Sequence, residues 1–403
     1  MDTSPAAAEK RENLASLGAG LFTNGVWDML SVVVPLYGVA VGLSAAEIGL
    51  VVAARSVLPT ALSIHGGIMM DQLGTRRVLA AVAVASAALP LLYPVSGWFA
   101  VLIVLQLLLG LATSLGMAAA QTWSLQASHG DTAILARFSV FSRIGTFLGP
   151  VTVGAIWDLF GAWAAFASVS LWATGIIASA AYARPGAAHF PPASGQRALS
   201  ALVPRWAPHK EAIALAAIPA VAFVLAVSFL RNAPGAVQSS LYVVYLADVG
   251  WSGTLIGALV ALSELFGVFG SMVAAPVERL LRAERLLLAC IAASVAAIAI
   301  TPLIGTFLTL LIVASAVRGI AQGISQPLMY SVLGRSVPVT THGKSVGLRN
   351  AVVRLASIIT PAAMGLAAEA WGIEASFYVV GVAFLVATAA LAVAAQRLSS
   401  PDA

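Results

Sequence analysis

The chain has 403 residues, of which 60% are hydrophobic and only 9% are charged. A water-soluble protein of this length carries about 25% charged residues, so the composition excludes a soluble fold and indicates a membrane protein. The net charge of +5 therefore gives no reason to expect nucleic acid as a partner. The single cysteine, Cys290, excludes an intramolecular disulfide and a thiolate metal cluster.

The predicted elements are apolar runs that recur along the chain and are separated by short polar or glycine-containing turns. Each run is long enough to cross a bilayer as a helix. They predict an all-α membrane protein with twelve transmembrane helices. In chain order the predicted spans are 14–41, 47–70, 77–95, 98–122, 137–160, 163–183, 218–247, 253–275, 285–303, 307–331, 346–370 and 373–395.

Lys and Arg are distributed unevenly between the loops of this predicted fold. The loops near Gly42, Gly97, Gly161, Gly305 and Gly372 contain neither residue, whereas the loops on the other side are basic. The positive-inside rule then places both termini in the cytoplasm. The predicted segments are a cytoplasmic tail at 1–13, a six-helix bundle at 14–183, a proline-rich cytoplasmic linker at 184–217, a second six-helix bundle at 218–395 and a cytoplasmic tail at 396–403.

The two predicted bundles repeat each other at offsets of 208 and 211 residues. Related positions are Asn24 and Asn232, Gly42 and Gly250, Arg143 and Arg354, Pro150 and Pro361, and Gly161 and Gly372. Such a repeat predicts two pseudo-symmetric bundles that arose by duplication. Because Arg143 and Arg354 occupy matched positions about two turns from the cytoplasmic ends of their helices, we expect a structural role for both.

The turn between the second and third predicted helices reads Gly67-Ile-Met-Met-Asp71-Gln-Leu-Gly74-Thr-Arg76-Arg77 and resembles the signature of the major facilitator superfamily. The matching positions are Gly67, Asp71, Gly74, Arg76 and Arg77, whereas Gln72 and Thr75 depart from the signature. The resemblance implies a secondary transporter in which this turn is part of a cytoplasmic gate. An ordinary basic loop between two membrane helices is the alternative.

The fifth predicted helix carries Gly145-x-x-x-Gly149-Pro150-x-x-x-Gly154, which resembles a motif of the antiporters in the same superfamily. Small residues four apart let helices pack closely, and proline removes a backbone hydrogen bond so that a helix can bend. The resemblance implies a gating role for Gly145, Gly149 and Pro150, with plain helix packing as the alternative. The fourth helix departs from the exporters, because Gln106 stands where they often have an arginine.

Seven charged side chains fall inside the predicted spans, where each would cost about 2.5–3.5 kcal/mol near the bilayer centre if it faced lipid. They are Asp28, Arg55, Arg143, Arg231, Glu264, Arg318 and Arg354. We expect each to face a partner or a water-filled cavity. Asp28 and Glu264 are the predicted proton-coupling acids, with Arg55 as the partner of Asp28, and plain structural salt bridges are the alternative.

A substrate site is predicted where polar side chains share a helix face at the depth of these charges. The predicted substrate-binding residues are Arg55, Arg231, Arg318, Asn24, Trp27, Gln238, Tyr242 and Gln322. Because five arginines inside the spans exceed two acids, the predicted interior is positive and favours an acidic or zwitterionic substrate. Ordinary packing is the alternative for the aromatic and amide residues.

These observations predict a secondary transporter that works by alternating access and exports a small organic solute in exchange for protons. Three alternatives remain open. They are uptake of an organic anion by symport or uniport, polyspecific drug export, and a membrane sensor that does not transport.

The sequence contains no phosphate-binding loop, nucleophile elbow or histidine cluster with metal-ligand spacing, so we expect neither an enzyme nor a bound metal or cofactor. The proton is the expected coupling ion. The expected partners are a small-molecule substrate and the lipid bilayer, without nucleic acid, and we expect a monomer. Abundant alanine and an excess of Arg over Lys favour a bacterial plasma (inner) membrane.

Overall fold

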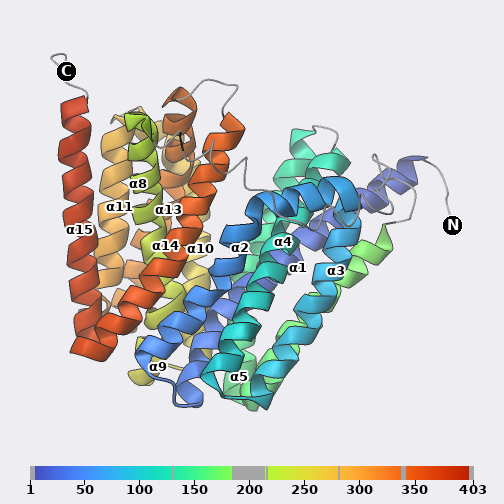
Figure 1. Ribbon diagram of the computed structural model, residues 1–403, viewed down its shortest axis with the longest axis horizontal. Coiled ribbons are helices and arrows are strands. Elements are labelled where there is room, and N and C mark those ends of the chain that lie inside the picture. The colour runs from blue at the N-terminus through green and yellow to red at the C-terminus, as the bar shows by residue number, and fades with distance from the viewer. Residues whose placement is uncertain are drawn as a thin grey trace. The chain divides into compact units, whose positions relative to one another are not determined.

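The structure is a computed structural model, and it describes residues 5–128, 131–183, 214, 217–279, 282–336 and 342–398. In these ranges the secondary structure is helical, without strands (Figure 1). The predicted linker at 184–217 and the outermost parts of both predicted tails lie almost entirely outside the described residues.

The helices follow the order of the predicted spans. They are α1 (Pro5–Ala40), α2 (Ala45–Leu73), α3 (Thr75–Ala88), η1 (Leu89–Val95), α4 (Phe99–Ser128), α5 (Thr132–Tyr182), α8 (Pro219–Val237), η3 (Gln238–Tyr242), α9 (Val243–Asp248), α10 (Gly253–Glu278), α11 (Ala283–Ala299), α12 (Thr301–Ile304), α13 (Leu308–Ser336), α14 (His342–Trp371) and α15 (Ile373–Leu398).

Ten stretches among the described residues are long and apolar enough to cross a bilayer. One of them, Ala133–Tyr182, has 50 residues and changes direction at Gly161, which has φ 77° and ψ −173°. It therefore contains two of the predicted spans. The remaining predicted span corresponds to α11, which has only 17 residues. All twelve predicted spans are present, and the prediction of an all-α membrane fold is confirmed.

Glycine determines the tightest of these turns. A single residue, Gly74, separates α2 from α3 and has a φ of 92°. An L side chain reaches that φ only with strain, so glycine is the residue that permits so short a connection. Four further glycines have positive φ, and all follow the ends of predicted spans: Gly42, Gly161, Gly250 and Gly372.

The helices group into two compact units. Unit 1 comprises the described parts of Met1–Tyr37, Ala54–Arg205 and Ser252–Gly257, and unit 2 those of Gly38–Ala53, Trp206–Trp251 and Ala258–Ala403. Each unit thus includes a short segment from the other predicted half, namely the beginning of α10 in unit 1 and the beginning of α2 in unit 2. The predicted domain boundaries at 14–183 and 218–395 stay predictions.

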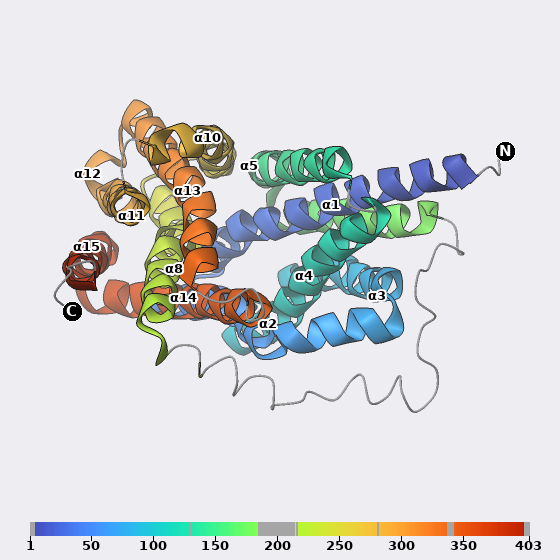
Figure 2. The same cartoon turned by 90° about the horizontal axis from the view of Figure 1, so that it is seen from above.

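In unit 1, α3 packs against α4 and α5, and η1 packs against α5 (Figure 2). Aromatic rings fill the core beside η1. The ring of Tyr93 stacks on that of Phe166 with 4.8 Å between centroids, and Tyr37 meets Phe166 edge-on at 5.3 Å. Both Tyr93 and Phe166 are fully buried, so these rings fix η1 against α5.

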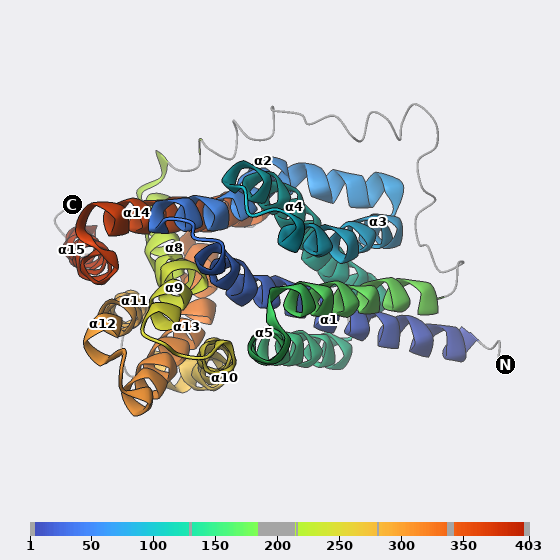
Figure 3. The ribbon, with the colours of Figure 1, turned by 90° about the horizontal axis from the view of Figure 1, so that it is seen from below.

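In unit 2, α11 packs against α13 and α15, while α14 packs against α8 (Figure 3). The core between α8, α11 and α13 consists of aliphatic side chains, among them Val227, Leu287, Ile291 and Met329. Polar side chains in this core form hydrogen bonds. The hydroxyl of Ser228, for example, donates to the carbonyl oxygen of Val224 at 2.7 Å.

Candidate functional site

Arg318 in α13 lies inside unit 2, with only 4% of its surface exposed. Its Nη1 donates a hydrogen bond to Oε1 of Gln238, and its Nη2 donates to Oγ of Ser263. The amide Nε2 of Gln238 also donates to Oγ of Ser263, at 3.3 Å. Among the described residues, both hydrogen-bond acceptors of Arg318 are therefore neutral.

A π-helical turn presents Gln238 to this arginine. The turn η3 connects α8 to α9, and Ser240 within it has φ −136° and ψ −105°. The Ser240 hydroxyl donates to the carbonyl oxygen of Ala236 at 2.7 Å, which satisfies one acceptor of the irregular backbone. Such single-turn π segments occur frequently at functional sites. Gln238 and Tyr242, at its two ends, are both buried.

Two further predicted residues lie near Arg318. Tyr242 and Glu264 are both close enough to interact electrostatically with its guanidinium. Glu264 follows Ser263 in α10, but its own side chain is exposed. The structure thus brings Arg318, Gln238 and Tyr242 together, with Glu264 at the edge of the group, and their role in substrate binding stays a prediction.

Arg231 in α8 forms a second polar cluster in unit 2. Its Nε donates to Oγ of Ser325 at 2.8 Å, and its Nη2 donates to the carbonyl oxygen of Gln322 at 2.9 Å. The Gln322 side chain returns a bond from Nε2 to the carbonyl oxygen of Arg231 at 2.7 Å. These reciprocal bonds tie α8 to α13. A substrate contact at Arg231 or Gln322 stays a prediction.

Arg55 in α2 is the corresponding buried cation of unit 1, with 6% of its surface exposed. Its Cζ lies 3.5 Å from the ring centroid of Trp27, and its Nη2 donates to the carbonyl oxygen of Trp27 at 2.5 Å. Asp28, the next residue of α1, is close enough to interact electrostatically with Arg55. The predicted neighbours Arg55, Trp27 and Asp28 are therefore together in unit 1.

Asn24, predicted to bind substrate, donates from Nδ2 to the carbonyl oxygen of Gly20 in its own helix at 2.8 Å, and a substrate contact there stays a prediction. Its repeat equivalent Asn232 donates to Val353 O at 3.0 Å and to Ser357 Oγ at 2.8 Å, which ties α8 to α14. The equivalent asparagines therefore have different hydrogen-bond partners in the two units.

Only part of the predicted cytoplasmic gate can be described. Gly67 and Asp71 lie in the last turns of α2, but their side chains fall outside the described residues. Arg76 donates from Nε to the carbonyl oxygen of Ala180 at 2.7 Å, so it satisfies an acceptor near the end of α5. Arg77 is exposed. The gating role of the motif stays a prediction.

Two glycines of the antiporter-like motif, Gly145 and Gly149, face α1 within unit 1. A Cβ atom at Gly145 would overlap with the carbonyl oxygen of Leu21, and one at Gly149 would lie 2.8 Å from that of Gly25. Glycine at these positions lets the two backbones approach closely. Pro150 follows inside α5 and is buried.

The matched arginines predicted to be structural differ in their surroundings. Arg143 is exposed on α5, whereas Arg354 is half-buried on α14. A shared structural role for the pair stays a prediction.

Asp158 in α5 caps the first turn of α10 within unit 1. Its carboxylate accepts bonds from the backbone nitrogens of Gly253 and Thr254, both at 2.7 Å, and from the Thr254 hydroxyl at 2.5 Å. Its repeat equivalent in unit 2 is Glu369, which accepts one bond from the nitrogen of Ala46 at 3.4 Å. The sequence analysis assigned no role to either acid, although the offset of 211 relates them.

Ser263, Ser325 and Tyr93 are the other site residues that the sequence analysis did not identify. Ser325 lies seven residues after Arg318, on the same face of α13, and this helical spacing was a usable signal. Among the described residues, the hydroxyl of buried Tyr93 has no hydrogen-bond partner, and Tyr93 is close enough to Arg55 to interact electrostatically. No comparable local pattern distinguishes Ser263 or Tyr93 from ordinary core residues.

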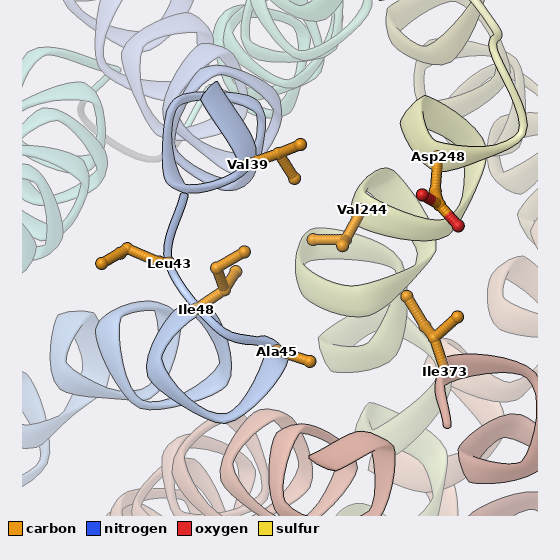
Figure 4. Close-up of a pocket in the computed structure, with 7 residues that line it drawn as sticks. All are labelled: Val39, Leu43, Ala45, Ile48, Val244, Asp248 and Ile373. Carbon is orange, nitrogen blue, oxygen red and sulfur yellow. The ribbon is translucent and has the colours of Figure 1, made fainter. Parts of the chain in front are cut away.

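A cavity of about 240 Å³ lies in unit 2 (Figure 4). Its lining is apolar except for one carboxylate, and consists of Val39, Leu43, Ala45, Ile48, Val244, Asp248 and Ile373. None of the predicted site residues belongs to it. Among the described residues, no group of three His, Cys, Asp or Glu side chains could hold a metal ion.

The described residues are helical, contain ten apolar stretches long enough to span a bilayer, and bury arginines in both units, which defines a multi-pass membrane protein with polar groups in its interior. The sequence matches the family model of the Major Facilitator Superfamily over residues 17–233 and 224–403, so the chain belongs to this superfamily. The resemblance noted in the turn from Gly67 to Arg77 is thus confirmed, and the protein is a membrane secondary transporter of this type.

Solved transporters share the fold. The nucleoside transporter NupG has a TM-score of 0.78 and 12% identity over 95% of this chain and 98% of that chain. A bacterial homologue of the human lysosomal transporter Spinster has a TM-score of 0.72 and 14% identity, with 98% of each chain covered. A POT family transporter in complex with 5-aminolevulinic acid has a TM-score of 0.73 and 14% identity, with 97% of each chain covered.

A curated relative from Oryza sativa subsp. japonica, the probable anion transporter 2, chloroplastic, is 29% identical over 159 residues. The aligned segment covers 39% of this chain and 30% of the relative, so the chain matches less than a third of that protein's length.

Proposed function

We propose that this transporter exports an acidic or zwitterionic organic compound across a bacterial plasma membrane, in exchange for protons. The observation that carries the proposal is the state of Arg318, a buried cation whose hydrogen bonds go to an amide and a hydroxyl oxygen. Neutral acceptors satisfy its hydrogen-bonding groups but leave its charge without direct compensation.

The positive charge of Arg318 is costly at the depth of the membrane unless a partner compensates it. An uncompensated arginine near the bilayer centre costs about 2.5–3.5 kcal/mol on insertion scales. A substrate carboxylate would compensate it through charge-assisted hydrogen bonds, which are roughly twice as strong as neutral ones. A cationic substrate would be repelled instead, so the site discriminates by the sign of the charge.

Three further observations support an anionic substrate, export and proton coupling. The relative that aligns over 39% of the chain is a probable anion transporter. The glycine and proline pattern of α5 resembles that of antiporters, which supports export. Asp28 and Glu264 lie close enough to Arg55 and Arg318 to interact electrostatically, which supports a proton-carrying role for these acids.

Membrane orientation follows from the basic loops, so we propose that both termini lie in the cytoplasm. We also propose that one chain is the transporting unit and that the proton is its only coupling ion. No cofactor enters this mechanism.

Flux in proteoliposomes with an imposed pH gradient tests the proposal. The panel should contain monocarboxylates, dicarboxylates, amino acids and lipophilic cations, each measured with and without the gradient. We expect gradient-dependent movement of at least one carboxylate or zwitterion and none of the cations. Transport of lipophilic cations without carboxylates would replace this proposal with that of a polyspecific drug exporter.

A further inference from the structure

The two terminal nitrogens of Arg318 are bonded to two different oxygen atoms. Oε1 of Gln238 accepts from Nη1, and Oγ of Ser263 accepts from Nη2. The oxygens come from separate elements, η3 and α10, and the bond from Gln238 Nε2 to Ser263 Oγ links them. All three side chains are buried.

A carboxylate binds arginine in a similar way, with each of its two oxygens accepting from a guanidinium nitrogen. We infer that Gln238 and Ser263 occupy the positions of a substrate carboxylate on Arg318, so that a substrate must displace their two oxygens in order to bind. The inference rests on the proposed function and identifies Gln238 and Ser263 as residues that determine specificity.

Without substrate, Arg318 requires other hydrogen-bond acceptors, and the oxygens of Gln238 and Ser263, here called stand-in oxygens, are such acceptors. A buried guanidinium without hydrogen-bond acceptors would be strongly destabilising, and the amide and hydroxyl oxygens meet this need without adding charge. Because they are neutral, a charged ligand can outcompete them. An acidic residue at either position would form an internal ion pair with Arg318 and would itself keep a substrate anion away.

Displacement also explains how neutral solutes are rejected. A neutral substrate that replaced these oxygens would exchange one pair of neutral acceptors for another and gain little. A carboxylate places a negative charge opposite the guanidinium in the same exchange and so gains ionic attraction as well. Affinity therefore depends on the difference between the substrate oxygens and the internal oxygens that they replace.

The variant Gln238→Glu tests this directly, because it preserves the size of the side chain and adds the competing charge. Binding of acetate, lactate, succinate, glutamate and benzoate is measured on purified protein by thermal shift and calorimetry. We expect at least tenfold weaker binding than wild type for each carboxylate that wild type binds. Gln238→Leu and Ser263→Ala each remove one stand-in oxygen, and we expect severalfold tighter binding for both.

Ser271→Ala is the matched control, because Ser271 lies two turns further along α10 and bonds to the carbonyl oxygens of Gly267 and Gly323. It should bind carboxylates as wild type does. Ser263→Ala keeps the inference testable if the glutamate variant does not fold.

The possible failures are distinguishable. If wild type binds carboxylates through Arg318, but Gln238→Glu binds them as tightly and Ser263→Ala no better, the inference is wrong and the proposed function stands. If wild type binds no carboxylate of the series, or if Arg318→Ala leaves their binding unchanged, the proposed function fails and the inference fails with it.

Discussion

The two units hold their buried arginines in different ways. In unit 1, Arg55 stacks on Trp27, and the acid Asp28 lies next to that tryptophan in the same helix. In unit 2, Arg318 bonds to an amide and a hydroxyl, and the nearby Glu264 is exposed. The first arginine has an aromatic face and an acid beside it, whereas the second has only neutral oxygens in direct contact.

The acids at the helix N-termini also differ between the units, because the acid in unit 1 makes more and shorter bonds. Asp158 makes three short bonds to the first turn of α10, whereas Glu369 makes one long bond to that of α2. A local reason exists, because α2 has its own capping box. Glu47 accepts from the Ser44 nitrogen at 2.8 Å, and the Ser44 hydroxyl accepts from the Glu47 nitrogen at 3.2 Å.

In α10 the position equivalent to Glu47 is Leu255, so the capping box is incomplete and the carboxylate of Asp158 replaces it. In unit 1 the carboxylate of Asp158 thus bonds to a helix N-terminus and Arg55 lies against Trp27 near Asp28, whereas among the described residues Arg318 has no carboxylate in direct contact. On the proposed function, we expect the substrate anion to bind in unit 2 and the coupling pair to be Arg55 and Asp28 in unit 1.

Removal of the unit 2 cation should have the largest effect. We expect Arg318→Ala to reduce carboxylate transport at least about thirtyfold, because truncating a buried charge partner costs about 2–5 kcal/mol of binding. Arg318→Lys should recover only part of it, since lysine does not offer the planar pair of donors. Flux in proteoliposomes measures both, and Arg143→Ala, which changes an exposed arginine, is the control.

Loss of the unit 1 acid should separate coupling from binding. We expect Asp28→Asn to lower pH-driven flux more than tenfold while substrate exchange without a gradient continues, because an amide cannot carry the proton. Glu264→Gln is the matched variant in unit 2. Gradient-driven transport that persists in both amides would show that the proton does not travel through these carboxylates.

The caps should give a smaller, structural effect. We expect Asp158→Ala to destabilise the protein by about 1 kcal/mol, as loss of a helix N-cap does, and to speed hydrogen exchange at the nitrogens of Gly253 and Thr254. Glu369→Ala should change stability by less than half of that. Equal effects of the two variants would contradict the difference between the caps.

The smallest expected effect is that of Thr254→Val, which removes only the hydroxyl bond to Asp158. We expect a loss of about 0.5 kcal/mol in the free energy of unfolding, since both backbone bonds to the carboxylate remain. Denaturation in detergent measures it. A loss as large as that of Asp158→Ala would mean that the hydroxyl, and not the helix N-terminus, holds the carboxylate.

Much of the fold could be predicted because it depends on local patterns. Length and hydropathy predicted the spans, and glycines such as Gly161 and Gly372 predicted their ends. The charges of Arg55 and Arg318 identified the polar interior because an unpartnered charge in lipid is too costly.

The partners of these charges could not be predicted in the same way. Ser263 and Gln238 meet Arg318 only after three segments have packed together, and an isolated serine carries no sequence signal of that packing. The π-turn at η3 adds a local change of helical register that periodicity does not reveal. The cap by Asp158 likewise links residues 95 apart in the sequence.

The role of Arg318 as the binding site of a substrate anion can be tested by comparing a carboxylate with its amide analogue, on wild type and on Arg318→Ala. The pair should be the carboxylate that ranks first in the flux panel and the amide of the same carbon skeleton, both measured by calorimetry. We expect wild type to bind the carboxylate at least tenfold more tightly and Arg318→Ala to lose this preference. Equal binding of the two by wild type, or an unchanged preference in the variant, would contradict this role of Arg318.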